Sequence, residues 1–243
     1  MNKTRADARD FANILKASDI ASCSKLQLFV IPPFPYIAEV ADILRDSNVK
    51  VGAQNMHWEN QGAWTGEVSP LMLKDCGATM VELGHSERRS YFNETDETVA
   101  LKTKAALEHG LIALVCIGDS HEEYEHGLTE LVLEKQVRAL LKYVPANVNQ
   151  KIIIAYEPVW SIGEGGTPAS PEFANQQHKK IAKLVLEITG TPVSILYGGS
   201  VNKSNCVDLA KQSHIDGIFI GRAAWNASDY IDIVNLVLES AGV

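Results

Sequence analysis

The amino-acid sequence predicts an α/β barrel of parallel strands, and three observations carry this prediction. Short β-rich runs alternate regularly with helical patterns along the whole chain. Polar and glycine-rich residues follow several of the runs, which indicates strands that end at one rim, as in a barrel with its site at the carboxyl ends. An open doubly wound sheet is the alternative, but no G-x-G-x-x-G fingerprint follows the first β-rich run.

Length and composition favour one enzyme domain. The chain has 243 residues, 46% of them hydrophobic, and no low-complexity linker divides it, so we expect a single barrel domain over residues 1–243. The net charge of −8 provides no overall attraction for nucleic acid or anionic membrane. No apolar run approaches the roughly 18 residues of a membrane span. We therefore expect a cytoplasmic protein that acts on a small molecule.

The predicted elements follow from hydrophobic periodicity. β-rich runs predict seven strands, at 26–31, 49–53, 79–83, 112–117, 152–156, 193–197 and 217–220. Helical spacing of apolar residues predicts a first helix around 8–15 and further helices at 36–45, 97–109, 122–143, 172–188, 204–212 and 230–240. The chain thus begins with a helix and not with a strand.

A carboxylate ends the fifth predicted strand. Glu157 follows the run 151–156, and Pro158, Trp160 and the glycine-rich loop 163–166 come next. A carboxylate at the mouth of a barrel strand is partly desolvated, which raises its proton affinity, and a closing loop would strengthen this by excluding water. Proline stiffens the strand exit, while the glycines give a lid freedom to reorient. The pattern predicts a general base beside a lid; a strand-end carboxylate in an ion pair remains the alternative.

A histidine follows the third predicted strand in the segment 84–89, G-H-S-E-R-R. Ser86 is suited to cap a helix that begins at Glu87. A helix amino terminus disfavours a nearby cation, so we expect His85 to be neutral and able to donate a hydrogen bond to a substrate carbonyl. A capped turn with surface ion pairs is the alternative.

Glycine-rich turns follow the last two predicted strands. Gly198, Gly199 and Ser200 could present backbone N–H groups to an anion, although a tight turn explains the same residues equally well. Gly221 and Arg222 follow the last strand, and barrel phosphate sites are commonly built from the last two strand-to-helix loops. The two turns together predict a phosphate site.

The remaining polar residues indicate no metal or redox centre. Four cysteines lie far apart without a C-x-x-C pair, and six further histidines lack ligand spacing: Cys23, Cys76, Cys116, Cys206, His57, His109, His121, His126, His178 and His214. Trp64 lies in a glycine-flanked segment, 62–67, where a partner subunit or the chain itself would have to cover it.

Four segments together resemble the triosephosphate isomerase family: G-H-S-E-R-R, A-Y-E-P-V-W-x-I-G, Y-G-G-S-V, and Gln54-Asn55 followed by G-A-W-T-G-E. They occur in family order over almost the whole chain. The resemblance implies an α/β fold, the (β/α)8 TIM barrel, that interconverts aldose and ketose phosphates through an enediol without metal or organic cofactor. By the same resemblance, the reaction is that of dihydroxyacetone phosphate and glyceraldehyde 3-phosphate in glycolysis.

The resemblance also implies roles for individual residues. Glu157 looks like the base that moves the proton, His85 like the neutral electrophile, and Glu87 like an acidic residue that supports the site. Thr65 matches the tip of a loop that crosses to a partner subunit, which implies a homodimer. The positions that match the phosphate-binding backbone are Gly163, Ser200, Gly221 and Arg222.

Three departures from the family pattern affect the prediction. Met1 and Asn2 align with the end of the family's first strand, so that strand and its lysine are absent, and we expect the natural polypeptide to begin upstream. Arg222 stands where the glycolytic enzymes have a second glycine, and the far hinge of the lid, 166–171, is longer than usual. These departures, with the segments 54–58 and 220–225, resemble a side branch that acts on L-erythrulose 1-phosphate and forms D-erythrulose or erythrose phosphate. A catalytically dead barrel that serves as a binding or assembly protein is the alternative of another class.

Overall fold

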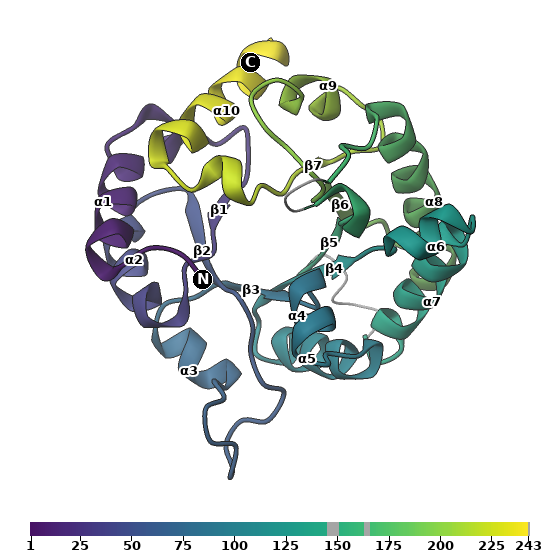
Figure 1. Ribbon diagram of the computed structural model, residues 1–243. Helices are drawn as coiled ribbons and strands as arrows, with labels where there is room; N and C mark the ends of the chain where they lie inside the picture. The colour runs from purple at the N-terminus through teal and green to yellow at the C-terminus, as the bar shows by residue number, and fades with distance from the viewer. Residues whose placement is uncertain (145–150, 163–165, 243) are drawn as a thin grey trace.

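The computed structural model describes residues 1–144, 151–162 and 166–242. Within them, seven parallel strands form one sheet in strict chain order. The strands are β1 (Leu28–Val30), β2 (Val49–Ala53), β3 (Met80–Leu83), β4 (Ile112–Ile117), β5 (Ile152–Tyr156), β6 (Ser194–Tyr197) and β7 (Gly217–Ile218). The sheet is curled, with the helices on its outside, so the prediction of an α/β barrel short of one strand is confirmed (Figure 1).

The helices alternate with the strands around this ring (Figure 1). They are α1 (Arg5–Lys16), α2 (Ile37–Leu44), α3 (Pro70–Asp75), α4 (Ser86–Tyr91), α5 (Asp96–Glu108), α6 (His121–Glu125), α7 (Thr129–Leu141), α8 (Pro171–Thr189), α9 (Cys206–Ala210) and α10 (Ala227–Ser240). Each crossover helix covers the outer face of the strands it connects, which is why the sheet can be parallel throughout. Within the described residues, none of these helices combines the length and apolar character that a membrane crossing requires.

The two edges of the sheet, β1 and β7, meet through side chains and not through backbone pairing. Phe29 on β1 and Phe219 after β7 approach with ring centroids 6.0 Å apart. Tyr230 on α10 donates its hydroxyl hydrogen bond to the carbonyl oxygen of Phe29 at 3.3 Å. The same tyrosine packs against Phe11 of α1, so the first and last helices lie together outside this seam. The seam therefore closes by apolar contacts where a full barrel has a strand.

The core has two layers because successive side chains on a strand point to opposite faces. The larger layer lies between the sheet and the helices, while a smaller cluster fills the interior: Met80, Leu114, Cys116, Ala155 and Leu196. Met80 belongs to the interior cluster and Val81 to the outer layer, so Glu82 shares the interior face with Met80. The interior of the sheet therefore holds a carboxyl group just below the rim at which the strands end.

Three helix predictions need correction. The predicted helix 122–143 is two helices, because Gly127 adopts a left-handed φ of 70° and ends α6. The helix after β3 begins at Ser86, with His85 and not Ser86 as its cap. The helix predicted at 204–212 is shorter, Cys206–Ala210, and Ser200 lies in a bend before it.

Candidate active site

His85 enters the site from the turn between β3 and α4. Gly84 has a φ of 70°, a left-handed conformation that glycine tolerates, and the turn directs the imidazole inward. The Nδ1 atom of His85 accepts a hydrogen bond from the backbone N–H of Glu87 at 3.2 Å. Since an accepting nitrogen carries no proton, the neutral ring has its proton on Nε2. This tautomer presents an N–H donor to the interior of the site.

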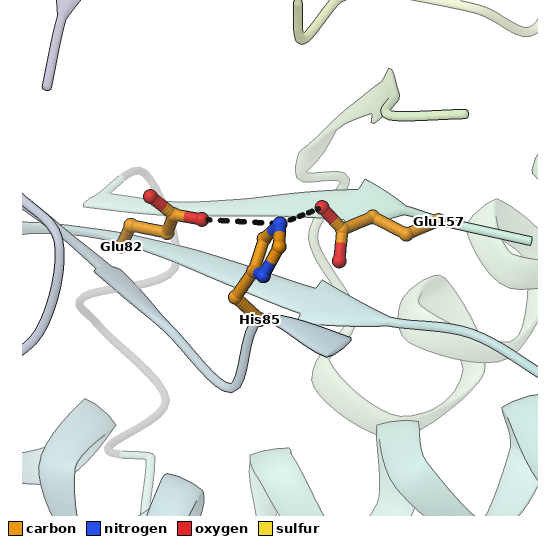
Figure 2. Close-up of side chains that lie close together, drawn as sticks. All are labelled: Glu82, His85 and Glu157. Carbon is orange, nitrogen blue, oxygen red and sulfur yellow. Dashed lines mark ion pairs between the residues drawn. The ribbon is translucent and has the colours of Figure 1, made fainter. Parts of the chain in front are cut away.

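Glu157 lies directly after β5, with only 2% of its surface exposed. Its backbone N–H donates to the carbonyl oxygen of Ile117 at 2.8 Å, which ties the strand exit to the end of β4. One carboxylate oxygen lies 3.3 Å from Nε2 of His85 (Figure 2). The other accepts a hydrogen bond from the backbone N–H of Ser86 at 3.4 Å. The predicted base and the predicted electrophile, which the sequence places after different strands, are therefore in contact.

The surroundings of this pair shift both pKa values. Burial raises the pKa of Glu157, and the nearby imidazole of His85 opposes this only in part. Burial lowers the pKa of His85, but the carboxylates of Glu157, Glu82 and Glu87 more than reverse that effect, so its pKa is raised. The backbone N–H at Nδ1 acts against protonation, because an imidazolium would turn that contact into two opposed donors. The hydrogen bond at Nδ1 thus favours the neutral imidazole, whereas the nearby carboxylates favour its protonated form.

A second carboxyl group, absent from the sequence prediction, lies on the other side of His85. One oxygen of Glu82 is 3.9 Å from Nε2 of His85 (Figure 2). The thiol of Cys116 donates to the same oxygen at 4.0 Å. Burial, chiefly, raises the pKa of Glu82 to about 7. The sequence signal was available: Glu82 is the only charged residue in the otherwise uncharged run 79–83, three positions before His85.

The strand exit that carries Glu157 is anchored by Asp119, which is fully buried after β4. Its carboxylate accepts hydrogen bonds from Thr129 Oγ1 at 2.6 Å, from the Tyr156 hydroxyl at 3.1 Å and from Trp160 Nε1 at 3.3 Å. The Trp160 ring also stacks on Tyr124 with centroids 4.2 Å apart. Glu157 therefore lies in the chain between Tyr156 and Trp160, and both of these side chains donate to the buried carboxylate of Asp119.

The predicted phosphate residues lie on neighbouring loops. The backbone N–H of Gly198, after β6, donates to the carbonyl oxygen of Tyr156 at 2.8 Å, next to Glu157. Because β6 pairs with β7, the turns that follow β6 and β7 adjoin. Ser200 is half-buried, with its carbonyl bonded to Asn205, whereas Gly221 and Arg222 are exposed. Space around Gly221 is open: a Cβ placed there would meet no atom within 4 Å. Gly163 and most of the predicted lid, at 163–165, lie outside the described residues.

Glu87 and Trp64 lie apart from the interior pair. The side chain of Glu87 is 70% exposed, with its carboxylate 3.9 Å from Nδ1 of His85, so its clear contact with the imidazole is through its backbone N–H. The segment between β2 and α3 extends away from the barrel (Figure 1). Within it Trp64 packs beside His57 yet remains 50% exposed, and Thr65 is exposed.

Glu82, His85 and Glu157 also form the one group of described residues spaced to hold a metal ion, with one ligand atom from each within 4.8 Å of the others. An imidazole and two carboxylates suit zinc or another divalent ion. The same three atoms are equally placed to share protons, since each titrates and each lies beside another.

Fold and site together define a class: a parallel barrel with a buried carboxylate and an imidazole donor in contact at the carboxyl rim. The sequence matches the family model described as triosephosphate isomerase over residues 1–237, and the chain belongs to that family. It is accordingly an enzyme of the isomerase class.

Several relatives bear one name. The L-erythrulose-1-phosphate isomerase of Brucella abortus (strain 2308) is 55% identical over 235 residues, which cover 96% of this chain and 92% of that protein. The protein of the same name from Mesorhizobium japonicum is 50% identical over the same shares. That from Rhizobium meliloti is 49% identical over 241 residues, which cover 99% of this chain and 94% of the relative.

Proposed function

We propose that this protein isomerises L-erythrulose 1-phosphate by proton transfer through an enediol. The observation that carries the proposal is the 3.3 Å contact between Nε2 of His85 and the buried carboxylate of Glu157. The names of the relatives favour this four-carbon substrate over dihydroxyacetone phosphate, the triose that the sequence analysis placed first.

In the proposed reaction, Glu157 is the general base. The substrate bears phosphate on C1, a ketone on C2 and hydroxyl groups on C3 and C4. Glu157 takes the proton from C3 and returns it to C2, while the Nε2–H of His85 donates to the oxygens on these two carbons as charge develops. The carbonyl thereby moves from C2 to C3 and gives an erythrulose 4-phosphate, with no change in oxidation state overall.

The raised pKa of Glu157 suits this role, because a more basic carboxylate is a stronger acceptor of a carbon-bound proton. Its burial also keeps water from competing for the intermediate. We assign the phosphate to the adjoining turns after β6 and β7, with Ser200, Gly221 and Arg222 beside it and Gly163 from the loop after β5. The open space at Gly221 and the exposed guanidinium of Arg222 support that assignment.

We also propose that residues 1–243 act as one barrel domain, because the seven strands found in the described residues share one sheet. The half-exposed Trp64, on a segment that extends from the barrel beside Thr65, supports a homodimer contact there (Figure 1). The free state of all four cysteines, Cys23, Cys76, Cys116 and Cys206, supports a reducing compartment such as the cytoplasm.

The test compares L-erythrulose 1-phosphate with dihydroxyacetone phosphate as separate substrates of the purified protein, with and without a metal chelator. We expect the higher kcat/KM on the four-carbon substrate, and the same rate after chelation. A higher kcat/KM on the triose would move the assignment to triosephosphate isomerisation. Absence of turnover on both would favour the dead barrel, for which Glu157→Gln would change nothing.

A further inference from the structure

Glu82 is a buried carboxyl group for which the proposed proton transfer has no use. It occupies the interior face of β3, where Met80 and the neighbouring Leu114 on β4 are apolar. Among the described residues, its only hydrogen-bond donor is the Cys116 thiol, at the long distance of 4.0 Å. A carboxyl group placed in an apolar interior with so little hydrogen bonding costs stability, so a purely structural role would be better served by a hydrocarbon side chain.

The position of Glu82 relative to the reacting pair is informative. Glu82 and Glu157 flank the imidazole of His85 from opposite sides, and both approach the same nitrogen (Figure 2). Glu157 follows β5, which pairs with β6 and so lies next to the turns assigned to the phosphate. Glu82 comes from β3, two strands away from β5 on the other side. A substrate with its phosphate at those turns and its reacting carbons at Glu157 would therefore extend its far end toward Glu82.

That far end differs between the two candidate substrates. In dihydroxyacetone phosphate, the chain stops at the carbon from which the proton is removed. In L-erythrulose 1-phosphate, a hydroxymethyl group, C4 with its hydroxyl, continues beyond that carbon. Resting on the proposed function, we propose that Glu82 is a specificity-determining residue whose carboxyl group forms a hydrogen bond with the C4 hydroxyl of the four-carbon ketose phosphate.

The chemistry of the carboxyl group fits this ligand. With a pKa raised to about 7 by burial, Glu82 changes between a neutral acid and an anion near neutral pH. The neutral form donates to a hydroxyl oxygen and the anion accepts from a hydroxyl proton, so either form can bind the C4 hydroxyl. A buried polar group that only one substrate satisfies discriminates strongly, because the other substrate leaves it without a partner.

The test measures the coupling between Glu82 and the C4 hydroxyl. Wild type, Glu82→Gln and Glu82→Leu are assayed with L-erythrulose 1-phosphate and with its 4-deoxy analogue, which lacks only that hydroxyl. We expect wild type to prefer the natural substrate by about 10- to 100-fold in kcat/KM, Glu82→Leu to lose most of this preference, and Glu82→Gln to retain part of it. Thermal melting and circular dichroism check that each variant is folded.

The matched control is Glu87→Gln, which changes another carboxylate 3.9 Å from the same imidazole but on its Nδ1 side. It is expected to leave the ratio between the two substrates as in wild type, whatever it does to the rates. An equal rate of wild type on the two substrates, or an unchanged preference in Glu82→Leu, overturns the role of Glu82 while the isomerase assignment stands. Inactivity of wild type on L-erythrulose 1-phosphate overturns both. The comparison of substrates on wild type needs no variant to fold.

Discussion

Gly118 offers a direct test of how closely the position of Glu157 controls turnover. It lies after β4, between Ile117 and Asp119. The carbonyl oxygens of these two residues accept hydrogen bonds from backbone N–H groups at the strand exit that carries Glu157. A Cβ at Gly118 would lie 1.8 Å from the carbonyl oxygen of Glu157 and 2.8 Å from its carbonyl carbon. Both atoms are backbone, so Gly118→Ala cannot be accommodated by a side-chain rotation.

The size of the effect follows from that distance. Non-bonded carbon and oxygen atoms require about 3 Å or more, so the backbone at Glu157 must move by at least about 1 Å. A displacement of about 1 Å in a reacting group can lower a rate about 100-fold. Overpacking of this kind also lowers the free energy of unfolding by about 1–3 kcal/mol. We therefore expect a folded Gly118→Ala protein with kcat lowered about 100-fold and KM changed much less.

The assay needs a variant that loses similar stability away from the site. Gly190 ends α8 with a φ of 71°, and a Cβ there would meet nothing within 4 Å, so Gly190→Ala introduces only backbone strain of about 1–2 kcal/mol. Unfolding in urea and steady-state kinetics are measured for both variants. If Gly118→Ala retains wild-type kcat, or if Gly190→Ala loses as much, then the close approach of Gly118 does not position Glu157 for catalysis.

Three further predictions concern the buried carboxylates. Glu157→Gln should lower kcat by about 10²–10⁴-fold without changing the elution volume in size-exclusion chromatography. In wild type, the acid limb of the pH profile of kcat/KM should lie above the ordinary pKa of glutamate, because burial raises the pKa of Glu157. Burial raises the pKa of Glu82 to about 7 from 4.5, so its carboxyl group costs the fold least below pH 4.5, where it is neutral in the folded and unfolded states, and its ionisation lowers the stability of wild type as pH rises through 7. In urea unfolding, Glu82→Gln should therefore gain up to about 3 kcal/mol relative to wild type by pH 8, and a difference that does not change with pH would argue against this assignment. Asp119→Asn replaces a carboxylate that accepts three hydrogen bonds by an amide, half of which is a donor. Chemical denaturation should show the free energy of unfolding lowered by about 2–4 kcal/mol, and a decrease of less than about 1 kcal/mol would contradict this prediction.

The strands were predictable because a strand buried on both faces is marked by continuous apolar sequence. The bounds predicted for β2, β4 and β5 are those observed. Each of these apolar runs is followed directly by a polar or glycine residue. The helix 122–143 was predicted as one element because apolar spacing continues through Gly127, and only the backbone conformation of that residue shows the break. Periodicity records which face is buried; it does not record a change of direction between two helices that bury the same face.

The candidate site was half predictable, for a related reason. Glu157 and His85 follow strands, so the parallel arrangement alone brings both to one rim. Glu82 lies inside a strand whose residues are all buried, and no alternation of polar and apolar residues marks its orientation. Whether such a side chain points to the helices or to the interior is set by the closure of the sheet, which is a property of all seven strands together.

The state of the imidazole depends more on one backbone hydrogen bond than on the helix that follows it. α4 has only six residues, so its dipole is small, and its first turn is capped by His85 itself. The bond from the N–H of Glu87 occupies Nδ1 and leaves the ring proton on Nε2, the atom that faces Glu157 and Glu82. The carboxylates on that side raise the pKa of His85, which shows that they favour positive charge on the ring and hold its N–H donor toward the interior of the site. An enediolate oxygen that replaces Glu157 as its partner would receive the same donor without any rotation of the ring.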